Sequence, residues 1–414
     1  MSRVLEAPSL GSKDVAQAVN ATNTPLDIAQ ALDDLVEALA ATAVHRDREG
    51  GHAARERELI RASGLLRLTI PLALGGLGAD WVSLLRVVRR LAQVDSALAH
   101  VFAFHHLQIA SVQLYGTTEQ QHRLQQLTAQ QHWFWGNASN PRDTRLVATP
   151  FRHGWVLDGE KSYASGSVGS DHLLISAHVD GGLGNGPELM IATVPTRAPG
   201  IKVQHSWDAF GQRQTDSGTV RFLGVRIARC DVLLAPGHVR TARQSLRTLL
   251  SRLIMTNLYT GLAQGALATA RRYTLDHARP WPGTGLARVA DDAVVQHRYG
   301  QLRLLVLPAQ LAADAAAERL LSAQQRGAAL GDDERGAVAL AVAEAKVLAH
   351  RAALEVSSQF FELTGAASTS MQHGLDRFWR NARVHTLHDP VDLKLRDIGR
   401  HVLDGVFPEP TSYS

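Results

Sequence analysis

The stretch RLVATPFRHGWVLDGEKSYASGS, residues 145–167, marks a change in the secondary structure of the chain. Its short runs of β-forming residues are interrupted by His-Gly and Asp-Gly pairs, which are typical of turns between neighbouring strands. The runs HLLISAHV, LMIATVP, IKVQHSW and GTVRFLGVRI continue this pattern further along the chain. Together they predict a central β domain over residues 132–236, of the size of one small sandwich or barrel.

The sequence on either side of this β domain has the periodicity of helices. Before it, ALDDLVEALAATAVHRDREG and several further segments carry apolar residues at helical spacing, which predicts an N-terminal helical domain over residues 25–131. After it, longer alanine-rich segments predict a C-terminal four-helix bundle over residues 237–414. Gly261 and Gly265, four residues apart, are expected to let a neighbouring helix approach closely. Residues 1–24 are polar and unpatterned, and we expect a loose lead-in there.

Composition and charge narrow the class of protein. The chain has 414 residues, of which 45% are hydrophobic and 20% are charged, as is ordinary for a globular protein. Its arginines are dispersed among acids at a net charge of +4, so we expect no nucleic-acid surface. The single Cys230 cannot form an internal disulfide, and no segment reaches about 18 consecutive apolar residues. These features predict a cytoplasmic protein that does not enter a membrane.

Several catalytic motifs are missing or out of context. The glycine-rich GGLG at residues 75–78 follows a helix rather than a strand, so it indicates a turn between helices rather than a dinucleotide site. The sequence has no P-loop and no G-x-S-x-G motif. The histidines of HVFAFHH (100–106) and HTLHD (385–389) fit the ligand spacing of zinc only loosely, so no metal site is expected.

Two segments of the β domain combine aromatic, small and polar residues. In HWFWGNAS, residues 132–139, aromatic residues lead into a small polar loop. This is compatible with a core strand and its turn, or with a loop that binds a flat heteroaromatic ring. In GEKSYASGSVGSD, residues 159–171, a strand ends at a Ser/Gly-rich segment, which forms either an ordinary loop or one that lies closely against a ligand.

The segment RNARVHTLHDP, residues 380–390, places two histidines near the end of a predicted helix. Residues three apart share one helical face, so His385 and His388 are expected to point the same way. Pro390 disfavours helical geometry in the residue before it, so Asp389 is expected to leave the helix. The segment therefore presents two imidazoles and a carboxylate.

The order of helices, β domain and helices, with GEKSYASGS and GQRQTDSGTVRFLGVRI, resembles the acyl-CoA dehydrogenase superfamily. The resemblance covers the chain from about residue 25. It implies a flavin between the β domain and the C-terminal bundle, and a homotetramer built largely through that bundle. In the common dehydrogenases of the superfamily, the glutamate that removes the substrate α-proton falls at Asp389 of this chain.

A closer resemblance is to the flavin monooxygenases of this superfamily, the group of dibenzothiophene monooxygenases and sulfur-acquisition oxygenases. The long segment DRFWRNARVHTLHDPV carries it, with AVHRDREGG, GLGADW, FWGNAS, GSVGSD, RQTDSGT and HARPW. It implies a two-component enzyme that takes reduced FMN (FMNH2) from a separate NAD(P)H-dependent flavin reductase. It also implies that O2 reacts at flavin C4a, and that one oxygen atom passes from the flavin (hydro)peroxide to an organosulfur substrate, a thiophene, sulfide or sulfinate.

The same resemblance implies roles for individual residues. It gives catalytic roles to His388, His385 and Ser165. It gives flavin contacts to Asn137, Ser139, Tyr163, Ser165 and Arg279, with Arg279 near the phosphate and from a neighbouring subunit. It gives substrate contacts to His100, Phe104 and Trp207. Two residues depart from the pattern, since Phe104 replaces a tyrosine of the dibenzothiophene enzymes and Ala367 stands where relatives often carry arginine.

Two other interpretations are compatible with these residues. One is a true acyl-CoA dehydrogenase with tightly bound FAD and an electron-transfer partner, in which Asp389 is the base. The other is a non-catalytic relative that binds flavin or another ligand without turnover. Removal of a proton next to a thioester requires a carboxylate, whereas stabilising a peroxide oxyanion requires hydrogen-bond donors, and HTLHD offers such donors.

Overall fold

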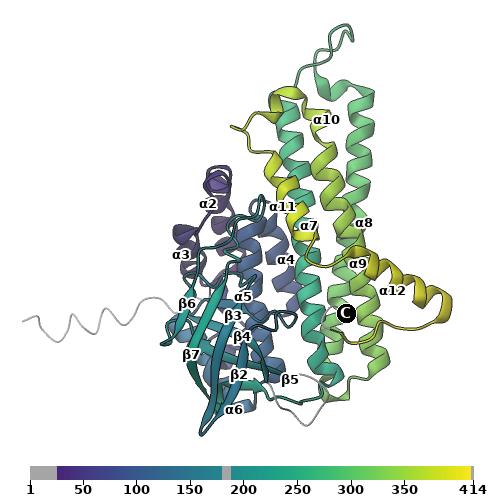
Figure 1. Cartoon of the computed structure of the whole chain (residues 1–414). Coiled ribbons are helices and arrows are strands. Elements are labelled where there is room, and N and C mark those ends of the chain that lie inside the picture. The colour runs from purple at the N-terminus through teal and green to yellow at the C-terminus, as the bar shows by residue number, and fades with distance from the viewer. Residues whose placement is uncertain (1–25, 180–187, 412–414) are drawn as a thin grey trace, which may run out of the picture.

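The N-terminal part of the fold is helical (Figure 1). The computed structural model describes residues 26–179 and 188–411, so the predicted lead-in of residues 1–24 lies outside the described residues. The helices are α2 (Ile28–Glu49), α3 (Ala54–Ala62), α4 (Trp81–Ala92), α5 (Ser96–Tyr115) and α6 (Thr118–Gln131). Almost every residue of α5 is buried, because ALAHVFAFHHLQIASV is largely apolar around the whole helix. α5 is therefore the central helix of this part.

A mixed sheet of eight strands follows the first helices. The strands are β1 (Trp135–Ala138), β2 (Val147–Phe151), β3 (Gly154–Lys161), β4 (His172–Val179), β5 (Glu188–Pro195), β6 (Ile201–Val203), β7 (Val220–Ala228) and β8 (Val232–Leu234). Their order is β6-β7-β3-β2-β4-β5-β8, and β1 pairs in parallel with β4. The parallel pairing places the end of β1, with its FWGNAS segment, beside the centre of the sheet.

The two turns expected within residues 145–167 have different outcomes. The His-Gly turn is confirmed, since β2 and β3 are antiparallel and meet at residues 152–153. The Asp-Gly turn is wrong, because Asp158 and Gly159 lie inside β3. Gly159 has a φ of 121°, and the pairing of β3 with β7 shifts register there. A Cβ at Gly159 would lie 2.0 Å from the carbonyl oxygen of Arg145, so the glycine permits a bulge rather than a turn.

The C-terminal part is again helical. Its helices are α7 (Ala242–Asp276), α8 (Ala293–Gln325), α9 (Asp332–Gln359), α10 (Phe361–Thr364), α11 (Asp376–Thr386) and α12 (Val391–Asp404). The long helices α7, α8 and α9 run side by side, and α11 packs against α7 and α9 (Figure 1). The close approach expected at Gly261 and Gly265 is confirmed. A Cβ at these positions would lie 2.3 Å and 2.0 Å from the carbonyl oxygens of Arg89 and Gln93 in and just after α4.

This architecture confirms the predicted fold class, mainly α with a central β domain between two sets of helices. The exact domain limits stay a prediction. Helix α7 contacts α4 and α5 of the first part as well as its own neighbours α8 and α9. Within residues 26–179 and 188–411, no helix has the length and apolar character that a bilayer crossing requires.

His105 joins the central helix α5 to strand β1. Its Nε2 donates to the carbonyl of Leu66 at 2.8 Å, and its Nδ1 accepts from the backbone N–H of Trp135 at 3.1 Å. These two bonds use both ring nitrogens of the neutral imidazole. The ring is fully buried, and burial lowers the pKa of His105 to about 4. His105 therefore positions β1 only while it is uncharged.

The first prediction concerns stability at acid pH. In the unfolded chain a histidine has a pKa of about 6.5, so between pH 6.5 and 4 the unfolded state binds a proton that folded His105 does not. The free energy of unfolding therefore falls as pH falls, by about 2 kcal/mol at pH 5 for this residue alone. Chemical denaturation of the unaltered protein and of His105→Gln, each at pH 7.5 and pH 5, measures the free energy of unfolding. The acid-induced loss should be smaller in the variant, and equal losses would contradict the assignment.

Candidate active site

A cavity of about 660 Å³ lies where α5, the sheet, α7 and the end of α11 meet. Every predicted site residue except Arg279 lines it. Helix α5 supplies His100 and Phe104; the end of β1 and the loop after it supply Asn137 and Ser139; the segments after β3 and β6 supply Tyr163, Ser165 and Trp207; and the end of α11 supplies His385 and His388. Residues from five separate segments of the sequence thus face one space of the size usual for ligand sites.

His385 and His100 are hydrogen-bonded to each other across the cavity wall. His385 Nε2 lies 2.9 Å from His100 Nδ1, and the ring of His100 stacks on Phe104 at 4.1 Å between centroids. Burial lowers the pKa of His100 to about 3 and also places the pKa of His385 well below its usual range. Both rings are therefore neutral at pH 7. Whichever ring donates in the pair, the other is left with an N–H for a ligand.

His388 lies in the turn just after α11 and has a different partner. Arg252 Nη1 approaches His388 Nδ1 at 3.2 Å, and a guanidinium can only donate. The same Nδ1 lies 3.5 Å from the Asp389 carboxylate, so this nitrogen faces both a donor and an acceptor. Burial lowers the pKa of His388, more than the nearby Asp389 carboxylate raises it. The sequence placed both histidines on one helical face; His388 instead follows the end of α11, and both residues still line the cavity.

Asp389 is not among the described residues that line the cavity. Its carboxylate is buried, pairs with the ammonium of Lys346 on α9, and lies 3.7 Å from Arg252 Nη1. Burial raises the pKa of Asp389, but the hydrogen bond with His388 and the charges of Arg252 and Lys346 outweigh it. The net pKa is far below its usual range. Such a carboxylate is a poor base, which speaks against the dehydrogenase interpretation.

Ser165 is the first member of a chain of hydroxyl groups. Thr215 Oγ1 donates to the carbonyl of Gln212 at 2.9 Å, so its 2.8 Å contact with Ser217 requires Ser217 to be the donor. The 2.7 Å contact between Ser217 and Ser165 then requires Ser165 to donate as well. Because each hydroxyl has one hydrogen, Ser165 has none left for the cavity. It can only accept a hydrogen bond from a ligand.

The loop after β1 is held in place by a second set of polar contacts. The backbone N–H of Asn137 donates to the carbonyl of Ser165 at 3.0 Å, and Asn137 Oδ1 accepts from Ser139 Oγ at 2.6 Å. Lys161 is fully buried, and its ammonium donates to the backbone carbonyl of Asn140 at 2.9 Å. Lys161 is the last residue of β3. Its contact fixes the loop whose residues Asn137, Ser139 and Asn140 face the cavity.

The cavity wall also contains buried polar atoms that have no hydrogen-bond partner among the described residues. They are His100 Nε2, His385 Nδ1, Ser176 Oγ and Gln212 Oε1, all from residues that line the cavity. Buried donors and acceptors are normally satisfied in proteins, so unsatisfied ones around one space indicate a polar ligand. Apolar walls from Phe104, Leu107 and Ile191 complete the lining. A flat heterocycle with several donors and acceptors, such as a flavin, fits this set.

Arg279 lies outside this cavity. It is exposed and follows the C-terminal end of α7, whereas Thr248, Ser251 and Arg252 line the cavity from the beginning of that helix. Helix α7 rises about 1.5 Å per residue, so Arg279 lies more than about 35 Å from Arg252 along the helix axis. One chain therefore does not bring Arg279 to its own cavity. Its contact with a neighbouring subunit stays a prediction.

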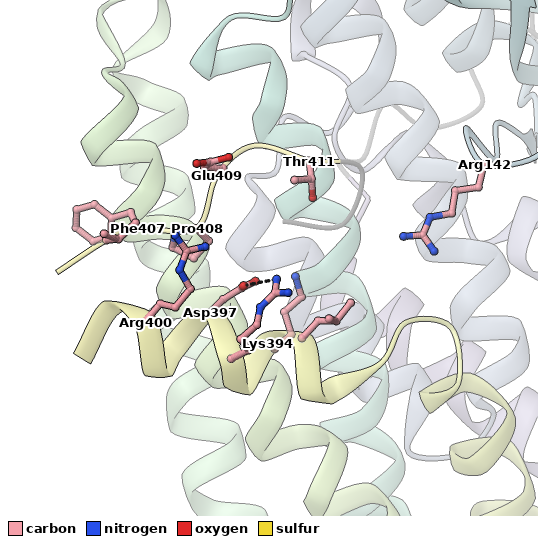
Figure 2. Close-up of a pocket in the computed structure, with 11 residues that line it drawn as sticks. Arg142, Lys394, Asp397, Arg400, Phe407, Pro408, Glu409 and Thr411 are labelled. Carbon is pink, nitrogen blue, oxygen red and sulfur yellow. Dashed lines mark hydrogen bonds and ion pairs between the residues drawn. The ribbon is translucent and has the colours of Figure 1, made fainter. Parts of the chain in front are cut away.

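A second cavity of about 380 Å³ lies between α12 and residues 406–411 (Figure 2). Its lining combines basic residues, among them Lys394, Arg400 and Arg142, with the acidic Asp397 and Glu409 (Figure 2). None of the predicted site residues lines it. Within the part of the chain that the structure describes, no cluster of three or more His, Cys, Asp or Glu residues is arranged to hold a metal ion.

Sequence reasoning missed several residues of the site, among them three polar ones. Arg247 and Arg252 lie on α7 and Ser217 lies in the loop before β7, and all three line the cavity. In the segment RTLLSR of α7, polar residues recur four apart between leucines. This spacing indicates a polar stripe on an otherwise apolar helix and was the available signal. Ser217 had no local signal, because its role depends on contact with Ser165, fifty-two residues earlier.

Comparisons with known proteins agree with this geometry. Residues 24–131 match the N-terminal domain model and residues 253–392 match the C-terminal domain model of acyl-CoA dehydrogenases. A probable FMNH2-dependent monooxygenase, SfnC of Pseudomonas putida, is 43% identical over 95% of this chain and 99% of its own length.

Two solved structures are also close. Methanesulfinate monooxygenase MsuC from Pseudomonas fluorescens superposes with a TM-score of 0.91 at 43% identity, over 95% of this chain and all of that one. FMN-bound TdsC, a dibenzothiophene monooxygenase of Paenibacillus sp. A11-2, gives a TM-score of 0.88 at 36% identity, over 93% of this chain and all of that one.

The fold, the cavity between sheet and bundle, and these matches define a flavoprotein of the acyl-CoA dehydrogenase family, to which this chain belongs. Within the family it falls in the branch of FMNH2-dependent monooxygenases, as the segment DRFWRNARVHTLHDPV predicted. The resemblance to that branch is confirmed, and so is the class of enzyme, a flavin-dependent oxidoreductase.

Proposed function

We propose that this chain is the oxygenase component of a two-component system that oxygenates a small organosulfur compound, a thiophene, sulfide or sulfinate. It takes FMNH2 from a separate NAD(P)H-dependent flavin reductase and uses O2 as the second substrate. One observation carries the proposal: neutral imidazoles of His100, His385 and His388 face the cavity, while Asp389 is directed into a buried ion cluster. The site therefore offers donors rather than a base.

In this proposal, different residues of the cavity bind the flavin and stabilise negative charge. Bound FMNH2 supplies two electrons and two protons, so that one atom of O2 is added to sulfur and the other leaves as water. His388 and one ring of the His100–His385 pair offer N–H groups to negative charge that develops on oxygen. Asn137, Ser139 and Ser165 would hold the flavin ring, and burial keeps the His100 and His385 rings uncharged.

Oxygen-dependent turnover tests the proposed function. The protein is mixed with FMN, a flavin reductase, NADH and a panel of thiophenes, sulfides and alkanesulfinates, and oxygenated products are measured. We expect product from at least one sulfur class, with no activity in the absence of O2 or reductase. Reduction of an electron acceptor by acyl-CoA, without product from the panel, would instead support the dehydrogenase.

Since the reductase requires NAD(P)H, we propose the cytoplasm as the place where both components act.

A second prediction concerns the redox state of the flavin. Because Ser165 can only accept, it favours the N5–H group that reduced isoalloxazine carries and oxidised isoalloxazine lacks. We expect FMNH2 to bind more tightly than FMN or FAD. In Ser217→Ala the Ser165 hydroxyl regains its hydrogen, so the ratio of FMN to FMNH2 dissociation constants should fall about fivefold, the worth of roughly one hydrogen bond. Anaerobic titrations measure both constants, and tighter binding of oxidised flavin by the unaltered protein would contradict it.

A third prediction concerns assembly. Leu304 and Leu311, seven residues apart on α8, are 67% and 59% exposed, and Val402 and Leu403 on α12 are 77% and 82% exposed. Neighbouring apolar side chains of this size are usually covered by a partner. We propose a homotetramer, in which Arg279 of one subunit reaches the flavin phosphate of another. Light scattering at micromolar concentration should give four times the chain mass of 44.9 kDa, and a monomer would refute the proposal.

A further inference from the structure

Arg247, near the beginning of α7, is a cavity residue with only neutral hydrogen-bond partners. Its Nε donates to Ser111 Oγ at 2.7 Å, and its Nη2 lies 3.3 Å from Ser139 Oγ and 3.4 Å from Gln108 Oε1. Among the described residues, no carboxylate lies within ion-pair distance of its guanidinium. Guanidinium groups removed from water are normally paired with an anion. Among the described residues, the anion that would balance Arg247 is missing.

The surroundings of Arg247 are positively charged. Burial lowers the pKa of Arg247, the Tyr115 hydroxyl opposes this effect, and the charges of Arg240 and Arg252 lower the pKa further. Arg252 is balanced by Asp389, which it approaches at 3.7 Å. Arg240 and Arg247 both line the cavity, and neither has such a pair among the described residues.

The remaining charge of the lining does not cancel this excess. Asp208 is the one carboxylate among the described lining residues, and it forms no ion pair with either arginine. The three imidazoles nearest the proposed reaction are neutral. The end of the cavity at the beginning of α7 is therefore suited to an anion. A planar guanidinium fork binds two oxygen atoms of one group particularly well.

We propose that Arg247, with Arg240 beside it, forms an oxyanion subsite for the charged group of the substrate, so that the chain prefers a small alkanesulfinate to a neutral thiophene or sulfide. Phe104 and Leu107, which line the cavity from α5, offer an apolar surface for the alkyl part. This inference rests on the proposed function and narrows its substrate class. The phosphate of FMN is the other oxyanion that this function brings to the cavity, and the experiment separates the two.

Binding of two probes of similar size and different charge tests the subsite. Methanesulfinate carries a negative charge, whereas dimethyl sulfoxide has nearly the same shape and is neutral. Calorimetry on the intact protein, with and without FMN, should show at least tenfold tighter binding of methanesulfinate. In Arg247→Gln this preference should fall at least tenfold, and Arg247→Lys should retain part of it. The matched control is Arg243→Gln, which changes the same charge one turn earlier on α7, outside the cavity lining.

The outcomes separate the possible anions. If Arg247→Gln weakens FMN binding and leaves methanesulfinate binding unchanged, the subsite holds the flavin phosphate and the inference is overturned. Equal binding of both probes by the unaltered protein also overturns it, and this result does not depend on whether a variant folds. Charge-dependent binding of methanesulfinate, without oxygenation of any thiophene, sulfide or sulfinate in the presence of FMNH2 and O2, would keep the subsite and reject the proposed function. If thiophenes are oxygenated at the same rate by the unaltered protein and by Arg247→Gln, the proposed function is kept and the subsite is rejected.

Discussion

His388→Ala is expected to consume FMNH2 and O2 and to release H2O2 in place of oxygenated product. The His388 ring lines the cavity and is held through Nδ1, which lies 3.2 Å from Arg252 Nη1 and 3.5 Å from the Asp389 carboxylate. Loss of one preorganised donor to an oxyanion costs on the order of a hundredfold in rate. Coupled oxygenation should therefore fall by about two orders of magnitude, while FMNH2 binding changes little. The ratio of product to FMNH2 oxidised, with H2O2 measured in parallel, reports this uncoupling.

Two variants control this prediction. His388→Gln keeps an N–H donor near the same place and should recover part of the coupling. His373→Ala removes an imidazole that packs against Tyr273 near the far end of α7, outside the cavity lining, and should leave coupling unchanged. Normal coupling in His388→Ala would show that this ring does not stabilise negative charge in the reaction.

Asp389→Asn is expected to weaken the fold far more than the chemistry. Asp389 and Lys346 are buried with Arg252, and removal of one member of a buried ion pair costs about 3 to 5 kcal/mol because the other charge is left uncompensated. Burial lowers the pKa of Lys346 to about 7, so this lysine loses its proton readily once the carboxylate is gone. The loss of stability should therefore lie near about 3 kcal/mol, the lower end of this range. Chemical denaturation at one protein concentration measures the change.

The same variant separates the two enzymatic interpretations. In an oxygenase, the folded fraction of Asp389→Asn should retain turnover within about tenfold, because the carboxylate does not face the cavity. In a dehydrogenase with Asp389 as base, the folded fraction should lose its activity altogether. The double variant Lys346→Met with Asp389→Asn should lose less stability than the sum of the single variants, since the two side chains contact each other.

Much of the fold could be predicted from the sequence because its determinants are local. The change from helical to strand periodicity is visible in residues 132–145, and the glycines at 261 and 265 indicated a close helix contact. The error at Asp158 and Gly159 had a physical cause. An Asp-Gly pair suits both a hairpin turn and a bulge, and only the register with β7 decides between them.

The candidate site was predictable only where a family resemblance placed residues on motifs. The positions of His385, Ser165 and Asn137 followed from such motifs, and the structure brings them to one cavity. What each residue does there depends on contacts distant in sequence. Asp389 belongs to an ion cluster with a helix more than forty residues earlier, and Arg247 meets Ser139 across more than one hundred residues. No local pattern reports on such pairs.

The origin of the oxygen atom in the product tests the central claim most directly. The protein, FMN, a flavin reductase and NADH are incubated with methanesulfinate under 18O2, and the product is analysed by mass spectrometry. The account predicts one atom of 18O in each molecule of sulfonate formed, and no label when 16O2 is supplied with labelled water. Sulfonate without 18O, or consumption of O2 that ends entirely in H2O2 for every sulfur compound tried, would contradict it.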